Sequence, residues 1–395
     1  TQSLLLNPDN SDIYFNLGKS YFETSKIIQA REAFNRTITI DPQHGPAYYY
    51  IGLINENIME IDKAVHAYAQ AQKYSPEIED VHYRLGMLLY RTGELKKAME
   101  PLRQFIINQP DNQHVLEVMG EIFISENRFP EAIDTYNRIL EIYPEKLETS
   151  LALAESYYQL KELKNAINIY QNILLFDDEN YEVMIRMGSI YNELGEYKEA
   201  ENILNQAINC TTPTMKMYYQ LALTYGNQGK YMSTVLAFQE ALKLKSDDVE
   251  IKYQLGIAYM ELYNFNVAAQ YFEEYVALNN QDEIAFFFLG KCYYEIGDYP
   301  AAILALQRAN ALSPNDHRIL YYIGKSYSGL GEESDAALTF RKALKINPED
   351  PEIYFELGKS YYKLNKNKKV TETLDILNML DRSLYDQLYF EIIRR

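Results

Sequence analysis

The chain has 395 residues and a formal net charge of −18 at pH 7. Hydrophobic residues make up 47% of it, which excludes an intrinsically disordered chain. The negative charge argues against binding to nucleic acid or to anionic lipid, because both require clustered Lys and Arg. No apolar run reaches the length of about 18 residues that a transmembrane helix needs, so we expect no insertion into a membrane.

A small residue recurs every 34 residues along nearly the whole chain. The positions are Gly18, Gly52, Gly86, Gly120, Ala154, Gly188, Ala222, Gly256, Gly290, Gly324 and Gly358. Twelve residues after each of them stands a second small residue in most units, with Thr234 and Val370 as the exceptions. No insertion disturbs the period, so the chain is expected to be an array of internal repeats.

Each repeat is predicted to hold two helices. In the ninth repeat, Leu289 and Tyr293 share one face of a first helix, and Ala302 and Ala309 share one face of a second helix. The small residues allow the two helix axes to approach closely. A proline such as Pro314 then stops the second helix before the next repeat begins.

In chain order, residues 1–10 are expected to be the tail of a preceding truncated repeat, because Asn7-Pro8-Asp9 has the form of a closing turn. We therefore expect the sequence to be part of a longer array. Residues 11–384 form eleven repeats, which start at 11, 45, 79, 113, 147, 181, 215, 249, 283, 317 and 351. Residues 385–395 are amphipathic with charges at the end, and a C-terminal capping helix is predicted there.

Two runs within the repeat resemble those of a known family. A large residue, Leu, Gly and Tyr appear as Tyr14, Leu17, Gly18 and Tyr21. Ala, an aromatic residue and Ala appear as Ala64, Tyr68 and Ala71. In both respects the chain resembles the tetratricopeptide repeat (TPR) family. The resemblance implies an all-α fold, an α-solenoid in which tandem helical hairpins stack into a right-handed superhelix with a concave groove.

No catalytic, cofactor or metal site is predicted. Gly-Lys-Ser at 18–20, 324–326 and 358–360 lacks the earlier glycine of a phosphate-binding loop and lies within predicted helices. The five histidines never pair at metal-ligand spacing. Cys210 and Cys292 are separated by several helix spacings, which excludes a disulfide between them. We therefore expect a protein that is not an enzyme and that needs no cofactor.

The family resemblance implies that a partner binds on the first helix of each repeat. The relevant residues lie three before, one after and four after the recurring small residue, and near the ends of the array many of them are aromatic or Lys. Aromatic rings supply contact area, and Lys can pair with carboxylates. The expected partner-binding residues are Phe15, Lys19, Phe22, Tyr49, Tyr83, Tyr90, Tyr253, Phe287, Lys291, Tyr294, Tyr321, Lys325, Phe355, Lys359 and Tyr362. The alternative is that these rings pack against the adjacent helix, with Lys lying over them.

Two groove chemistries known in the family are not supported. The clamp that grips a chaperone C-terminus pairs Lys with Asn, and only Asn16 is near such a position. The Asn ladder of sugar-transferring relatives needs Asn two residues before each small residue. Those positions hold Tyr50, Phe288 and Tyr322, among others.

The leading hypothesis is a protein–protein interaction scaffold or adaptor, part of a larger bacterial assembly. It would bind an extended peptide, a helix or a partner subunit in the concave groove. The alternative is a substrate-recruiting arm of a larger enzyme whose catalytic domain lies outside this sequence. Self-association through the terminal repeats is a third possibility. The wealth of Ile, Asn and Tyr is typical of an AT-rich, bacterial genome, and cytoplasmic and periplasmic locations both stay open.

Overall fold

The computed structural model describes residues 10–393. Over this range the chain consists of twenty-three α-helices, α2 to α24, and contains no strand. The tail of a preceding repeat expected for residues 1–10 lies outside the described residues, apart from Asn10. The Asn10 side chain accepts a hydrogen bond from the backbone N–H of Ile13 and so caps α2.

The helices come in pairs, and the first helix of a new pair begins every 34 residues. The first helices are α2 (Ser11–Glu23), α4 (Gly45–Asn57), α6 (Glu79–Arg91), α8 (Gln113–Ser125), α10 (Leu147–Gln159), α12 (Tyr181–Leu194), α14 (Met215–Asn227), α16 (Val249–Glu261), α18 (Glu283–Ile296), α20 (His317–Gly329) and α22 (Pro351–Lys363). The second helices are α3 (Ile27–Ile40), α5 (Ile61–Tyr74), α7 (Leu95–Asn108), α9 (Phe129–Ile142), α11 (Leu163–Phe176), α13 (Tyr197–Cys210), α15 (Tyr231–Leu244), α17 (Phe265–Leu278), α19 (Tyr299–Leu312), α21 (Glu333–Ile346) and α23 (Asn367–Leu380). The chain ends with α24 (Arg382–Ile393).

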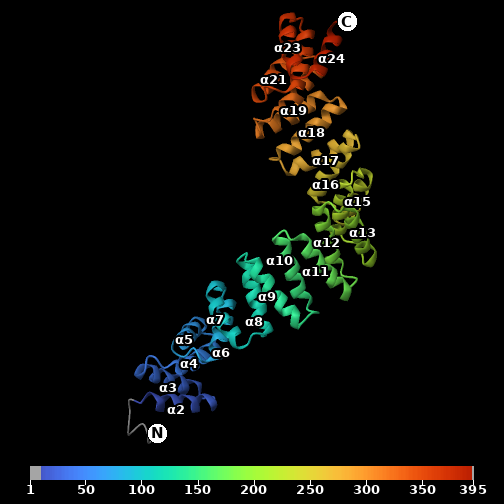
Figure 1. Ribbon diagram of the computed structural model, residues 1–395. Coiled ribbons are helices and arrows are strands. Elements are labelled where there is room, and N and C mark those ends of the chain that lie inside the picture. Colours follow the sequence, from blue (N-terminus) through green and yellow to red (C-terminus); the bar gives the residue numbers. More distant parts are fainter. Residues whose placement is uncertain (1–9, 394–395) are drawn as a thin grey trace. The chain divides into compact units, whose positions relative to one another are not determined.

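The helices divide into two units, residues 1–178 and 179–395. Within each unit, helices that follow one another in sequence lie against one another (Figure 1). In the second unit the first helices α18, α20 and α22 also touch their neighbours of the same kind. This arrangement confirms the expected all-α fold of tandem helical hairpins.

Local sequence explains where the helices begin and end. Many first helices are capped by Asp or Asn, as at Asp282, whose carboxylate accepts a hydrogen bond of 2.9 Å from the backbone N–H of Ala285. The turn inside each pair contains one residue with a positive φ. These residues are Ser25, Met59, Gly93, Asn127, Lys161, Gly195, Gly229, Tyr263, Gly297, Gly331 and Asn365.

The core of a pair forms where the small residue of the first helix meets a large residue of the second. A methyl group at Gly324 would come within 2.5 Å of the Phe340 ring, so the two helices are in direct contact there. The last pair differs, because Gly358 faces Leu388 of α24 instead. This helix begins at Arg382 rather than at residue 385, since Asp381 accepts hydrogen bonds from the backbone N–H groups of the next turn and caps it.

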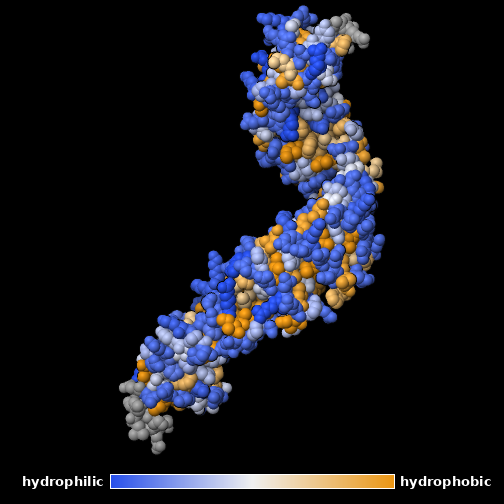
Figure 2. Space-filling view, viewed as in Figure 1, coloured by the Kyte–Doolittle hydropathy of each residue, from blue (hydrophilic) through white to orange (hydrophobic). Residues whose placement is uncertain are grey.

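The surface is predominantly polar. Figure 2 shows hydrophobic residues in short patches among hydrophilic ones on the visible face. Within residues 10–393, no helix is both long enough and apolar enough to cross a membrane. The same residues contain no cluster of His, Cys, Asp and Glu that could hold a metal ion. Cys210 and Cys292 are both free thiols.

Candidate functional site

Most of the predicted residues of the second unit lie on α18, α20 and α22. We define the α18–α20–α22 face by the residues Phe287, Lys291, Tyr294, Tyr321, Tyr322, Lys325, Phe355 and Lys359. On α18, Phe287, Lys291 and Tyr294 are four and three residues apart, so they share one side of the helix. The touching first helices place the corresponding residues of α20 and α22 next to them.

Lys325 occupies the centre of this face. Its ammonium lies 4.6 Å from the ring centroid of Tyr294, 5.2 Å from that of Tyr321 and 5.5 Å from that of Tyr322. Cation–π contacts of this kind contribute roughly 0.5–1 kcal/mol each at exposed sites. Three rings from two helices therefore hold the charge in place without neutralising it.

Tyr322, which is not among the partner-binding residues predicted from the sequence, connects the aromatic residues of the face. Its ring centroid lies 5.6 Å from that of Phe287, 5.7 Å from that of Tyr294 and 5.5 Å from that of Tyr321. All three pairs meet edge to face, which is a favourable arrangement for aromatic rings. Tyr322 thus joins α18 to α20.

Two of the three lysines on the face have no ion-pair partner among the described residues. Among the described residues, no carboxylate lies within ion-pair distance of Lys291 or Lys325. Lys291 lies 6.0 Å from the Tyr322 ring. Lys359 differs, because it pairs with Glu356 at 3.3 Å while it lies over the Phe355 ring. The α18 and α20 part of the face is therefore where an added carboxylate would find a free cation.

The tyrosines of the face keep neutral hydroxyl groups. Burial raises the pKa of Tyr294 to about 12, with smaller effects of the same sign from Glu356 and Glu295. Burial also raises the pKa of Tyr321, and Glu356 and Glu352 add to this shift. Within the described part of the chain, the hydroxyls of Tyr294, Tyr321 and Tyr322 make no side-chain hydrogen bond. Their hydrogen-bonding capacity is therefore not used within this part of the chain.

Phe355 of the face and the two predicted residues outside it, Tyr253 and Tyr362, are placed differently. Phe355 is only 8% exposed and packs with Leu377 and Leu388. It therefore belongs to the core beneath the face and offers a partner little contact area. Among the described residues, the ring of Tyr253 on α16 does not pair directly with a ring of the face. Its ring centroid lies 6.4 Å from that of Phe288, which in turn neighbours Phe287 of the face. Tyr362 is partly buried against the core of the last pairs.

The first unit repeats the aromatic arrangement near its N-terminal end. Tyr50 lies 5.9 Å from Phe15 and 5.3 Å from Phe22 between ring centroids, and both pairs meet edge to face. Lys19 lies over the Phe15 ring at 5.8 Å. Tyr50 occupies the same position in its repeat as Tyr322, two residues before the small residue.

Other predicted residues of the first unit already have partners inside the protein. The Tyr49 hydroxyl donates a hydrogen bond of 2.6 Å to Asp80, and the Tyr90 hydroxyl donates one to Glu121. Tyr83 packs on the ring of Phe105. The hydroxyls of Tyr49 and Tyr90 are thus engaged, whereas Lys291, Lys325 and the hydroxyls of Tyr294, Tyr321 and Tyr322 have no such partner among the described residues.

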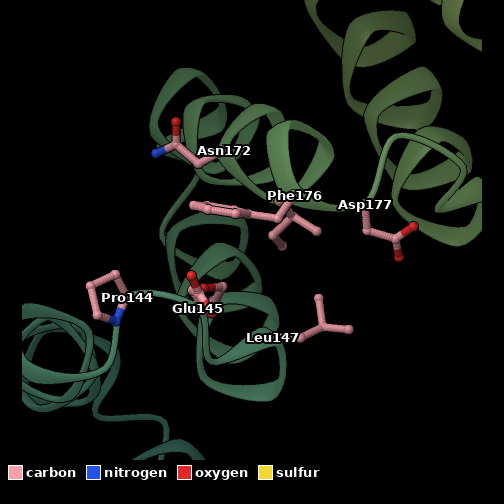
Figure 3. Close-up of a pocket in the computed structure, with 8 residues that line it drawn as sticks. Pro144, Glu145, Leu147, Asn172, Phe176 and Asp177 are labelled. Atoms are coloured by element: carbon pink, nitrogen blue, oxygen red, sulfur yellow. The ribbon is translucent and has the colours of Figure 1, made fainter.

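A separate cavity in the first unit has about 170 Å³ of space (Figure 3). The Phe176 ring lies between Asn172 and the turn that carries Pro144 and Glu145. Pockets that hold small ligands usually measure about 300–1,000 Å³. This cavity is below that range, and the α18–α20–α22 face is the stronger candidate for a functional site.

Comparison with known proteins agrees with the architecture. Sequence models of the tetratricopeptide repeat match residues 11–44, 60–113, 123–179, 161–221, 219–283, 253–317 and 330–365. No curated protein sequence matches the chain.

Several solved structures are similar to this chain at low sequence identity. The C-terminal part of a TPR repeat-containing protein from Cytophaga hutchinsonii is 18% identical, with a TM-score of 0.50 over 58% of this chain and 94% of that one. The MamA protein is 24% identical, with a TM-score of 0.41 over 42% of this chain and 92% of that one. A chain of the APC/C hetero-tetramer Cut9–Hcn1 is 15% identical, with a TM-score of 0.41 over 99% of this chain and 91% of that one. Since repeat models match along most of its length, the chain belongs to the tetratricopeptide repeat family.

Proposed function

We propose that this protein is a binding scaffold that holds a carboxylate-bearing segment of a partner protein on the α18–α20–α22 face. The observation that carries the proposal is the pair of uncompensated ammonium groups, Lys291 and Lys325, set among tyrosines with free hydroxyls. Such a surface offers contact area, hydrogen-bond donors and positive charge together. We propose binding, rather than catalysis, as its role.

The chemistry of the face favours an acidic segment over an apolar one. A carboxylate that reached Lys325 would replace water around a charge that is already held by three rings. Little ordering of the Lys side chain would then be needed on binding, which lowers the entropic cost of the contact. The ring faces of Tyr321 and Tyr322 can cover aliphatic side chains of the same segment.

The proposal is tested by affinity capture from the source organism with three versions of the protein. The first is wild type, and the second combines Lys291→Glu, Lys325→Glu and Lys359→Glu. The third combines Lys342→Glu, Lys366→Glu and Lys368→Glu, which change the net charge equally at exposed positions outside the face. Wild type and the third protein are expected to recover the same partners, and the second to lose them.

Folding of the variants is checked by circular dichroism and thermal denaturation. Should the Lys→Glu substitutions unfold the protein, Lys291→Gln with Lys325→Gln removes the charges at nearly constant shape. Unchanged partner recovery by the folded variants of the face would contradict the proposal. Equal loss with the third protein would mean that overall charge, and not this face, governs binding.

A further inference from the structure

A second groove lies between α21 and α23, with α22 as its floor. It has about 450 Å³ of space, which is within the usual range of about 300–1,000 Å³ for ligand pockets. Tyr354 and Tyr361 of α22 line it. Tyr354 and Tyr361 are seven residues apart, so they share one side of α22. Phe355 and Tyr362, the residues that directly follow them, lie on a different side of the helix. The groove is therefore distinct from the α18–α20–α22 face.

The groove contains an excess of positive charge. Arg341 and Lys345 of α21 and Lys369 of α23 line it, together with one carboxylate, Glu372. No ion pair joins any of the three cations to a carboxylate among the residues that the structure describes. Glu372 lies 4.0 Å from Lys368, which stands outside the groove. In a chain with a net charge of −18, a groove with three unpaired cations is an exception.

Two of the cations, Lys369 and Arg341, act on Tyr361 of the floor. The Lys369 ammonium lies 5.1 Å from the ring centroid of Tyr361. Burial raises the pKa of Tyr361, and the positive charge of Arg341 opposes this shift in part. All three cations are exposed, so an incoming group can reach them.

A groove at the matching place in the first unit has a different charge pattern. It lies between α3 and α5 over α4, has about 720 Å³ of space and is lined by Arg31, Glu60, Asp62 and Lys63 among others. Lys63 pairs there with Glu60 at 2.9 Å. The fold thus forms a groove between two second helices in each unit. Of these two grooves, only the α21–α23 groove has an excess of positive charge.

We propose that the α21–α23 groove binds an acidic peptide segment of a partner protein, with its carboxylates on Arg341, Lys345 and Lys369. Charge complementarity identifies the carboxylates. The aliphatic side chains that line the groove, Leu344 and Ile376, together with the Tyr354 ring, offer cover for apolar side chains of the same segment. A small inorganic anion would leave this apolar surface uncovered. The site goes beyond the proposed function of the α18–α20–α22 face.

The proposal is tested with the full chain and a fluorescein-labelled synthetic peptide that repeats Glu-Leu-Glu, with binding followed by fluorescence anisotropy. A control peptide carries Gln in place of every Glu. The groove variant combines Lys345→Glu with Lys369→Glu. The matched control combines Lys342→Glu with Lys368→Glu, which lie on the same two helices, change the charge equally and do not line the groove.

The acidic peptide is expected to bind wild type and the matched control with Kd values that agree within about twofold. The groove variant is expected to bind it about tenfold more weakly, a loss of about 1.4 kcal/mol. The Gln peptide is expected to bind weakly to all three proteins. If the groove variant fails to fold, Arg341→Gln is tested in its place, since it removes one exposed cation without adding an opposite charge.

Four results would overturn the proposal: no binding to wild type, equal weakening in the matched control, equal binding of the Gln peptide, or displacement of the peptide by inorganic phosphate at constant ionic strength. The variant with Lys291→Glu, Lys325→Glu and Lys359→Glu separates the two sites. Peptide binding that is lost in that variant and retained in the groove variant would place the acidic segment on the α18–α20–α22 face. That outcome would contradict this proposal and leave the proposed function standing.

Discussion

At the scale of single residues, the turn inside each helix pair requires a left-handed backbone, and at Met59 the residue that adopts it is not glycine. Met59 has a φ of 60° and is 80% exposed, so its side chain contributes little packing to offset the strain. The left-handed conformation costs an L-residue roughly 1–2 kcal/mol. Met59→Gly removes this strain but adds freedom to the unfolded chain, which costs about 0.4–1 kcal/mol.

We expect Met59→Gly to stabilise the protein by about 0.5–1 kcal/mol, measured as a higher urea midpoint. Gly93→Ala is the reciprocal test. Gly93 has a φ of 79°, and a methyl group there would meet no atom within 4 Å, so no contact in the folded state changes. The added backbone strain is partly offset by the smaller conformational freedom of the unfolded chain. That variant is expected to lose about 1 kcal/mol. A lower midpoint for Met59→Gly, or an unchanged one for Gly93→Ala, would show that these turns store no such strain.

The sequence predicts part of the candidate site and misses its central residue Tyr322, together with Tyr50 at the matching position in the first unit. The 34-residue period identifies Lys325 and Tyr294, because equal positions in successive repeats fall on equal sides of their helices. Tyr50 and Tyr322 lie two residues before the recurring small residue, a position that the sequence pattern links only to the Asn ladder of sugar-transferring relatives. A search for aromatic residues at those positions would have found both. The burial of Phe355 depends on α24, which lies outside the period, so the repeat could not predict it.

At the scale of elements, α24 closes the last helix pair. Leu388 of this helix is fully buried and lies where a methyl group on Gly358 would come within 2.5 Å of it. In the other pairs that keep a glycine, a residue of the second helix fills this place, as Phe340 does against Gly324. The sequence predicts this helix, because the end of the chain is amphipathic. It does not predict the start at Arg382, because the capping residue Asp381 falls within the span that the period assigns to the last repeat.

We expect Leu388→Ala to destabilise the C-terminal end of the array. Truncation of a buried Leu costs about 2–5 kcal/mol, and in repeat proteins such losses act mainly on neighbouring elements. Hydrogen–deuterium exchange should therefore rise in α22, α23 and α24 while α2 to α11 keep their protection. Phe390→Ala is the control, since Phe390 lies on the same helix and is 58% exposed. Equal exchange in both variants would mean that α24 is not docked through Leu388.

At the scale of the whole molecule, tyrosines whose pKa is raised by full or partial burial are distributed over both units. Burial raises the pKa of Tyr49 and Tyr136 in the first unit to about 12, and that of Tyr253 and Tyr294 in the second. The pKa of a tyrosine in the unfolded chain is about 10. A folded-state pKa above the unfolded value means that the folded protein binds more protons between these two pH values. The stability from this source is complete below about pH 10 and is lost as the pH rises toward 12.

We therefore expect helix content, measured by circular dichroism, to fall between about pH 10 and 12 together with a late rise in tyrosinate absorbance. A second cause would act in the same range, because loss of Lys charges makes a chain of net charge −18 still more negative and increases its self-repulsion. Ionic strength separates the two causes. Added salt screens repulsion between exposed charges but has little effect on the ionisation of buried hydroxyls. A transition that stays in place as salt is raised assigns the alkaline unfolding to the tyrosines, and one that salt abolishes assigns it to net charge and contradicts this prediction.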